Sequence, residues 1–126
     1  MPKSFGCWNS IYKRFNAWSS SSKWIRVFKA LIIDPDREWK FIDGSYVKAH
    51  QHSAGAAYKK PQAIGKSRAG NTTKIHLAVD GYGLPVEFEI TGGEVNDCSA
   101  AADLIARSPD AQVIIADKGY DSEHIR

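Results

Sequence analysis

The sequence predicts a mixed α/β fold that follows a short helical region, and three patterns of apolar residues support this expectation. Residues 73–79 and 86–90 alternate apolar and polar side chains, which is the period of a strand with one buried face. The unbroken run Val113-Ile114-Ile115 predicts a short strand that is buried on both faces. Residues 8–33 instead repeat apolar side chains three and four positions apart, which is the spacing of a helix.

Charge is distributed unevenly along the chain. Residues 1–33 and 44–79 carry basic side chains and no acid, whereas residues 80–126 carry ten of the fourteen acids. Two long acid-free stretches favour a polyanionic partner, and nucleic acid is the natural one. No apolar run approaches the roughly 20 residues that span a bilayer. Cys7 and Cys98 form no ligand spacing, so we expect reduced thiols in a cytoplasmic protein without a membrane contact.

The region before the sheet is expected to contain two helices. Four serines at residues 19–22 separate them, and Ser22 is placed to cap the second helix. The pair could form a DNA-binding unit, or an amphipathic hairpin whose aromatic side chains pack on the next domain. The second interpretation is favoured for the aromatic residues, while the basic residues remain candidates for phosphate contacts. Asp34-Pro35-Asp36 ends the helical pattern, which predicts domains at residues 1–36 and 37–126.

Two of the expected strands carry an aspartate at a position suited to chemistry. The strand over residues 39–46 places Asp43 on the same face as two aromatic side chains. Asp117 closely follows the apolar run at residues 113–115, and ligands gather outside the carboxyl ends of buried strands in open α/β sheets. A carboxylate there needs a cation, a metal or a hydrogen-bond donor to compensate it. The alternative is that Asp117 only caps the next turn, before a helix that starts at Asp121-Ser122.

The segment after the first strand is expected to be irregular. Residues 47–71 lack a clear period and contain several glycines, which predicts a long loop. His50 and His52 could supply half of a metal site, but no further ligand stands nearby at a suitable spacing. Surface histidines are therefore the favoured interpretation.

The second and third strands should form an antiparallel hairpin, because the turn signal Asp80-Gly81-Tyr82-Gly83 lies between them. One shared core requires three apolar pairs: Ile75 with Ile90, Leu77 with Phe88, and Val79 with Val86. The same register sets His76 opposite Glu89 on the outer face of the sheet. Asn96 or Asp97 is then expected to cap a helix with an inward stripe of Ala101, Leu104 and Ile105.

Three segments of the chain form a specific combination of motifs. They are Phe41-Ile42-Asp43-Gly44-Ser45-Tyr46, then Gly65-Lys66-Ser67-Arg68-Ala69-Gly70 with Thr72-Thr73-Lys74-Ile75-His76, and Ala116-Asp117-Lys118-Gly119-Tyr120-Asp121-Ser122. Together they resemble bacterial DDE transposases of the insertion-sequence four and five families, over residues 38–126. The resemblance implies an RNase H-like catalytic core of the retroviral-integrase superfamily, incomplete in this chain. Residues 1–36 would then be a remnant of the N-terminal DNA-binding part.

The resemblance also implies that Asp43 and Asp117 are catalytic residues that bind Mg²⁺ or Mn²⁺. In that chemistry two ions about 4 Å apart activate the attacking oxygen and stabilise the leaving one, and such hard cations prefer carboxylate oxygens. The family's third acid is a glutamate from a later helix, and it has no counterpart before Arg126. Glu123 lies outside any matching motif. We therefore expect a truncated transposase that is inactive alone.

Double-stranded DNA is the partner that the resemblance implies, as insertion-sequence ends and as target, with a homo-oligomer possible. Basic residues around the site are expected to hold the DNA backbone without reading its sequence. The candidates are Lys48, Lys59, Lys60, Lys66, Arg68 and Lys74. Two alternatives stay open, namely a non-enzymatic DNA-binding remnant and an RNase H-like nuclease of another family.

Overall fold

The structure is a computed structural model that describes residues 2–50, 52–53, 62–123 and 125. The chain divides into two compact units, Met1–Ile33 and Asp34–Arg126. The division lies slightly before the boundary expected between residues 36 and 37, at the start of the Asp34-Pro35-Asp36 segment. The DNA-binding and catalytic roles assigned to the two parts stay predictions.

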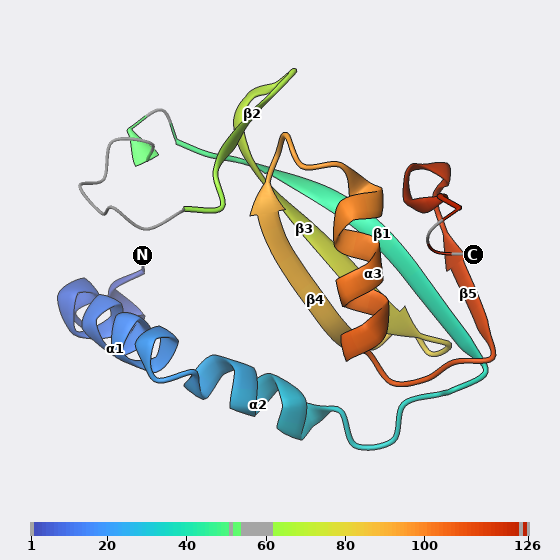
Figure 1. Ribbon diagram of the computed structural model, residues 1–126. Coiled ribbons are helices and arrows are strands. Elements are labelled where there is room, and N and C mark those ends of the chain that lie inside the picture. The colour runs from blue at the N-terminus through green and yellow to red at the C-terminus, as the bar shows by residue number, and fades with distance from the viewer. Residues whose placement is uncertain (1, 51, 54–61, 124, 126) are drawn as a thin grey trace. The chain divides into compact units, whose positions relative to one another are not determined.

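The first unit is helical, as the spacing of its apolar residues predicts (Figure 1). A short 3-10 helix, η1, covers Lys3–Phe5, and the two α-helices are α1 at Trp8–Ser20 and α2 at Lys23–Leu31. The rings of Trp18 and Trp24 lie 4.9 Å apart between centroids and join the two α-helices. Ser22 occupies the cap position of α2, but its side chain makes no capping hydrogen bond. None of the described helices is long enough and apolar enough to cross a bilayer.

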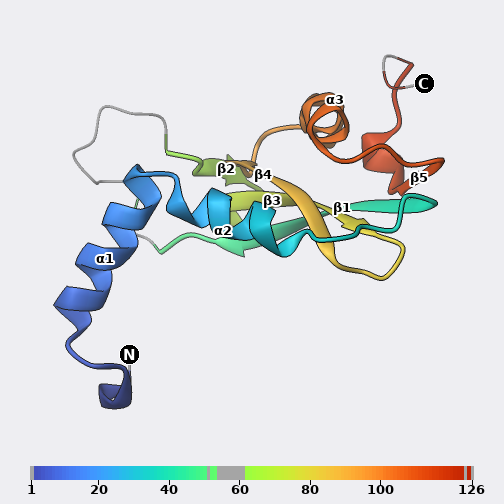
Figure 2. The ribbon, with the colours of Figure 1, turned by 90° about the horizontal axis from the view of Figure 1, so that it is seen from below.

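In the described part of the chain, the second unit contains a five-stranded mixed sheet (Figure 1). The strands are β1 at Trp39–Lys48, β2 at Gly65–Ser67, β3 at Gly70–Asp80, β4 at Pro85–Gly92 and β5 at Val113–Ala116. β3 pairs antiparallel with β1, β2 and β4, and β5 pairs in parallel with β1. Helix α3, at Asp97–Arg107, lies on one side of the sheet (Figure 2), and the 3-10 helix η3 at Lys118–Tyr120 follows β5. The expected α/β class is confirmed.

The hairpin of β3 and β4 has the predicted register over most of its length. Three expected pairs are present: Ile75 with Ile90, Leu77 with Phe88, and His76 with Glu89. The expected pair of Val79 and Val86 is wrong, because the register shifts after Ala78 and brings Pro85 opposite Val79. A bulge of this kind inserts one residue into a strand and increases the local twist.

Helix α3 covers the face of the sheet that was expected to be the outer one, and it leaves the expected core face uncovered. Helix α3 packs through its buried residues, Ala100, Ala101 and Leu104, onto the face that carries His76. His76 is 0% exposed, so its expected place on the outer face is wrong. The other face carries Trp39, Phe41 and Ile90, which are 43%, 39% and 48% exposed. Alternation therefore identified the strands but not the face that a helix covers.

The covered face can be buried because several of its polar groups, Lys40, Lys74 and His76, are paired. Lys40 is 3% exposed, and its Nζ donates a hydrogen bond to Oγ of Ser108, just beyond α3, at 2.7 Å. Burial lowers the pKa of the Lys40 amine. An unpaired polar group in this place would cost about 1–3 kcal/mol. Because they are paired, these polar side chains can lie beneath α3, where the sequence pattern predicts apolar side chains.

Two further expectations are corrected. The strand Val113–Ala116 is present, but it is not buried on both faces, since its first three side chains are 41% to 42% exposed. Among the described residues β5 pairs with β1 alone, which leaves its other edge open. Strands also occupy parts of residues 47–71, where a loop was expected, because β1 continues to Lys48, β2 begins at Gly65 and β3 begins at Gly70. Residues 51 and 54–61 of that span lie outside the described residues.

Replacing Leu104 by alanine should lower the free energy of unfolding by about 2–5 kcal/mol, because a fully buried side chain leaves a cavity that refills only in part. Leu84→Ala is the matched control. Leu84 is 60% exposed in the turn after β3, so its replacement should change the free energy by less than about 0.5 kcal/mol. Urea unfolding followed by circular dichroism measures both. A loss in Leu104→Ala no larger than in the control would contradict the packing of α3.

Candidate active site

Asp43 and Asp117 belong to neighbouring segments of the sheet. β1 and β5 pair in parallel with Ile42 opposite Ala116, and each aspartate is the next residue along its segment. Because paired strands lie about 4.8 Å apart, the backbones at the two aspartates are adjacent. Both side chains are exposed. This register permits the two carboxylates to share one ligand.

Each carboxylate uses one oxygen to hold its own turn. Oδ1 of Asp43 accepts a hydrogen bond from the backbone N–H of Gly44 at 2.7 Å, and Oδ1 of Asp117 accepts one from Lys118 at 2.5 Å. Asp117 is the N-cap of η3, so the capping interpretation describes the local structure correctly. Asp121 ends η3 rather than starting a helix. A cap that uses one oxygen leaves the other available for a cation, so the two roles of Asp117 are compatible.

Tyr120 turns its side chain from η3 into the covered face. It is 4% exposed, and its hydroxyl lies 2.9 Å from Nδ1 of His76 on β3. The two rings meet edge to face, with centroids 5.9 Å apart. Nε2 of His76 lies 3.0 Å from Oγ1 of Thr91 on β4. The turn that follows Asp117 is therefore anchored to the β3–β4 hairpin.

An ion pair beside this contact joins β3 to α3. Nζ of Lys74 lies 2.5 Å from Oδ1 of Asp97, the first residue of α3, and the Lys74 side chain is only 4% exposed. Burial acts to lower the pKa of Lys74, but the hydrogen bonds and charges of Asp97 and Tyr46 outweigh burial and raise it. Lys74 is thus part of an internal ion pair, which corrects its place among the DNA-binding candidates.

Burial, modified by the surrounding charges, sets the protonation states of Tyr120 and His76. Burial raises the pKa of Tyr120, and the charges of Asp97, Asp43 and Asp117 raise it further, so the hydroxyl stays protonated. Burial lowers the pKa of His76 in spite of the opposing charge of Asp97, so the imidazole is neutral near pH 7. Three carboxylates therefore lie near enough to raise the pKa of one buried hydroxyl.

Two glycines let these segments approach closely. A Cβ atom at Gly44 would lie 2.7 Å from the hydroxyl of Tyr120, and one at Gly119 would lie 2.9 Å from Oδ2 of Asp97. Both distances are shorter than real Cβ contacts, so a larger residue would force these groups apart. From the sequence, Asp97 was expected only as a possible cap of helix α3, and Tyr120 had no expected role; the structure places Asn96 at the cap position and Asp97 as the first residue of the helix. The pair Gly119-Tyr120 just after the strand was the feature of the sequence that could have indicated a close contact there.

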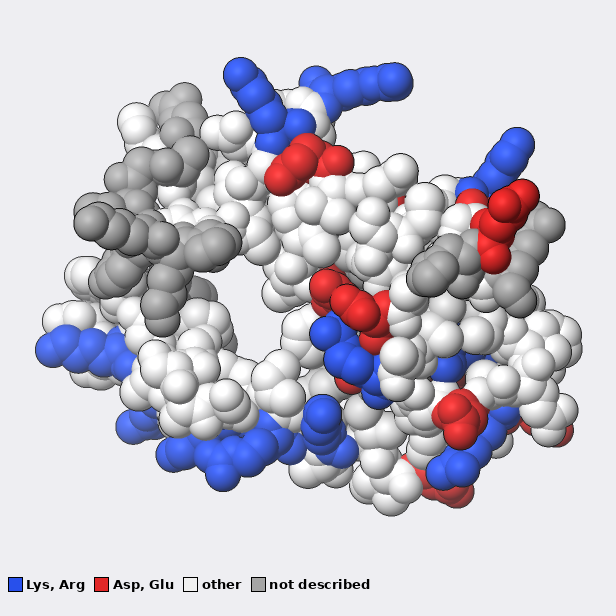
Figure 3. All heavy atoms as spheres, in the orientation of Figure 1, with Lys and Arg blue, Asp and Glu red and all other residues white. Residues whose placement is uncertain are grey.

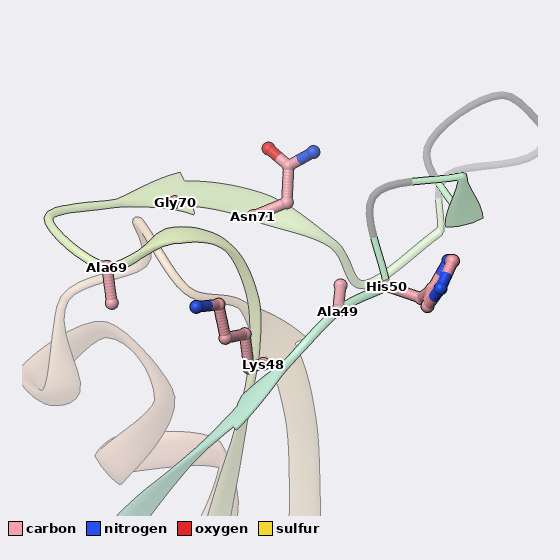
Figure 4. A pocket seen from close by; sticks show the side chains of 6 residues that line it. All are labelled: Lys48, Ala49, His50, Ala69, Gly70 and Asn71. Carbon is pink, nitrogen blue, oxygen red and sulfur yellow. The ribbon is translucent and has the colours of Figure 1, made fainter.

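The remaining basic candidates gather at another end of the sheet. Lys48, Lys66 and Arg68 are exposed where β1 ends and β2 turns into β3. Figure 3 shows Lys and Arg side chains extending into solvent where Figure 1 draws β2. A pocket of about 680 Å³ there is lined by Lys48, Ala49, His50, Ala69, Gly70 and Asn71, and Lys48 reaches toward the turn at Ala69 (Figure 4). Lys59 and Lys60 lie outside the described residues.

Metal-binding side chains are scattered rather than clustered in the part of the chain that the structure describes. No three residues of the types His, Cys, Asp and Glu are grouped there as a metal site. His50 and His52 are exposed, with their ring centroids 5.3 Å apart. The carboxylates of Asp43 and Asp117 are thus the candidate donors at this site.

Comparison with known proteins points to one family. The family described as "Transposase DDE domain" matches residues 35–126. A protein of Brucella ovis named "Putative transposase for insertion sequence element IS6501" is 40% identical over 55 residues, which are 44% of this chain and 42% of that protein. "Uncharacterized protein y4sN" of Sinorhizobium fredii is 32% identical over 60 residues, 48% of each chain. The chain thus spans less than half the length of these curated relatives, and no solved structure matches it.

The neutral, buried His76 predicts a pH dependence of stability. Because its pKa is lowered in the folded state, the unfolded chain binds more protons below about pH 6.5, and the free energy of unfolding should fall as the pH drops from about 7. His76→Asn should flatten this fall, whereas His52→Asn, at an exposed position, should not. Urea unfolding between about pH 7.5 and about pH 5.5 measures the slopes. Equal slopes in His76→Asn and the parent chain would contradict a buried neutral imidazole.

Proposed function

Because the chain belongs to the transposase DDE domain family, we propose that it acts in DNA transposition as the transposase of a bacterial insertion sequence. The proposed reaction is metal-dependent cleavage and transfer of DNA strands, which is phosphoryl transfer. The Brucella ovis relative, whose name assigns it to an insertion sequence element, supports this choice.

The proposed core is RNase H-like. β1, β3 and β4 form an antiparallel group, α3 follows them in the chain, and β5 then pairs in parallel with β1. This order of strands and helix supports the fold that the sequence motifs imply. In such a core the first strand and the strand after the helix carry the two aspartates.

The parallel register of β1 and β5 is the observation that carries the proposal. It makes Asp43 and Asp117 neighbours although 74 positions separate them in the sequence (117 − 43). Both carboxylates are exposed, and each is held by the N–H of the following residue. A rigid pair of acids at one point of a sheet is suited to catalysis that depends on positioning.

The two carboxylates fit a hard divalent cation, Mg²⁺ or Mn²⁺. Their donors are oxygens, which such ions prefer, and their exposure leaves room for the waters that Mg²⁺ keeps. When bound, the metal would activate an attacking oxygen and stabilise a leaving one. Asp43 and Asp117 would hold it, and the backbone bonds to Gly44 and Lys118 would orient their carboxylates.

The proposed DNA contacts are made by the exposed basic residues near β2. Lys48, Lys66 and Arg68 carry positive charge at one end of the sheet, and Lys59 and Lys60 belong to the same basic stretch of the sequence. Charges of this kind neutralise phosphates without reading bases. Lys74 is left out because Asp97 already pairs with its ammonium.

Asp43→Asn and Asp117→Asn should each weaken binding of Mn²⁺ at least about tenfold, because each removes a charged oxygen donor. Electron paramagnetic resonance of free Mn²⁺ gives the affinity. Asp103→Asn, at an exposed position of α3, makes the same change of charge and should bind like the parent chain. Parent-like affinity in both site variants would refute the proposed metal ligands.

The triple variant Lys48→Gln, Lys66→Gln and Arg68→Gln should reduce the salt dependence of DNA binding. Each lost phosphate contact lowers the slope of log affinity against log salt by about one, so a reduction of about two to three is expected. Anisotropy of a labelled duplex in KCl measures it. Arg37→Gln, which removes an exposed charge before β1, is the control. A slope unchanged in the triple variant would contradict this DNA-binding surface.

A further inference from the structure

We propose that Tyr120 is a positioning residue for the metal site, because its hydroxyl ties the turn that carries Asp117 to the strand that carries Asp43. The inference rests on the proposed function, since it takes the two aspartates as metal ligands. Tyr120 itself does not touch the metal. It acts by fixing the backbone segments from which the carboxylates project.

The first step concerns the turn after Asp117. Tyr120 is the last residue of η3, and its side chain is inserted between elements of the covered face. The hydroxyl is 2.9 Å from Nδ1 of His76, whose Nε2 in turn contacts Thr91. Since His76 is fully buried, this chain of bonds ends in the rigid β3–β4 hairpin. The turn thus has a fixed anchor three residues from its aspartate.

The second step concerns the strand of Asp43. A Cβ atom on Gly44 would lie 2.7 Å from the hydroxyl of Tyr120, so the hydroxyl rests against the backbone of the residue next to Asp43. The same Cβ would lie 3.2 Å from Cε of Lys74. Glycine at position 44 is therefore required for the tyrosine to reach β1. The hydroxyl of the segment that carries Asp117 thus packs against the strand that carries Asp43.

The third step concerns helix α3, which closes the arrangement. Asp97 at its start pairs with Lys74, and a Cβ atom on Gly119 would lie 2.9 Å from Oδ2 of Asp97. The backbone of η3 is consequently held between the helix and the sheet. The hydroxyl of Tyr120 supplies the polar contact within this packing, and phenylalanine would keep the ring but lose that contact.

Tyr120→Phe tests the inference in the full 126-residue chain. Groups that orient metal ligands from behind typically contribute tenfold or more to affinity, so we expect binding of Mn²⁺ to weaken about tenfold. The amide signals of Gly44 and Lys118, which donate to the two aspartates, should shift in metal-free spectra. Tyr82→Phe is the control, since Tyr82 is 77% exposed in the turn between β3 and β4.

A second pair of variants separates positioning from simple packing. Gly44→Ala places a methyl group against the hydroxyl and should lower the thermal unfolding midpoint. Adding Tyr120→Phe removes the clashing oxygen, so the double variant should regain part of that loss. Its affinity for Mn²⁺ should nevertheless stay at the level of Tyr120→Phe, because the hydroxyl is still absent. Affinity that recovers together with the unfolding midpoint would overturn the positioning role.

The outcomes also distinguish this inference from the proposed function. If Asp43→Asn and Asp117→Asn leave Mn²⁺ binding unchanged, the metal site itself is wrong and the role of Tyr120 falls with it. If both abolish binding while Tyr120→Phe binds Mn²⁺ like the parent chain and leaves the two amide signals unmoved, only the role of Tyr120 is overturned. Weaker binding with shifted amides, at an unfolding midpoint close to that of Tyr82→Phe, supports it.

Discussion

The ion pair between Lys74 and Asp97 is the contact on which the arrangement of the second unit depends. It joins the central strand β3 to the first residue of α3. A buried charge is costly unless it is paired, so the lysine can occupy the covered face only while the helix supplies its carboxylate. Ala100 and Ala101 are small enough for α3 to approach the sheet at that distance. Nδ1 of His76, which contacts Tyr120, lies 3.5 Å from the Asp97 oxygen of this pair.

The strands could be predicted from the sequence because alternation has a strict period of two. The same period gave most of the hairpin register, including the position of His76 opposite Glu89. It could not give the direction of burial. That choice depends on which helix residues meet which strand residues, and hydrophobicity alone does not indicate that Lys74 meets Asp97 of α3 on the covered face. His76 is buried on the same face.

The two aspartates could be proposed from the sequence because each belongs to a motif beside a recognisable strand. The parallel pairing of β1 with β5 makes their backbones neighbours. The tyrosine contact could not be anticipated. It joins a glycine in the first motif to a tyrosine in the second, and only packing on α3 brings the two together. Lys74 shows the reverse case, since a lysine in a basic stretch gives no sign of being buried.

The exposed apolar face of the second unit should respond to added salt in the opposite way to a phosphate-binding surface. Trp39, Phe41 and Ile90 are exposed on it. Added salt weakens contacts with phosphate, whereas strongly hydrated anions such as sulfate favour the burial of apolar surface. If the proposed phosphate contacts are present, added sulfate would therefore weaken them and at the same time favour the burial of this face. The effect on the apolar face depends on the identity of the anion as well as on its concentration.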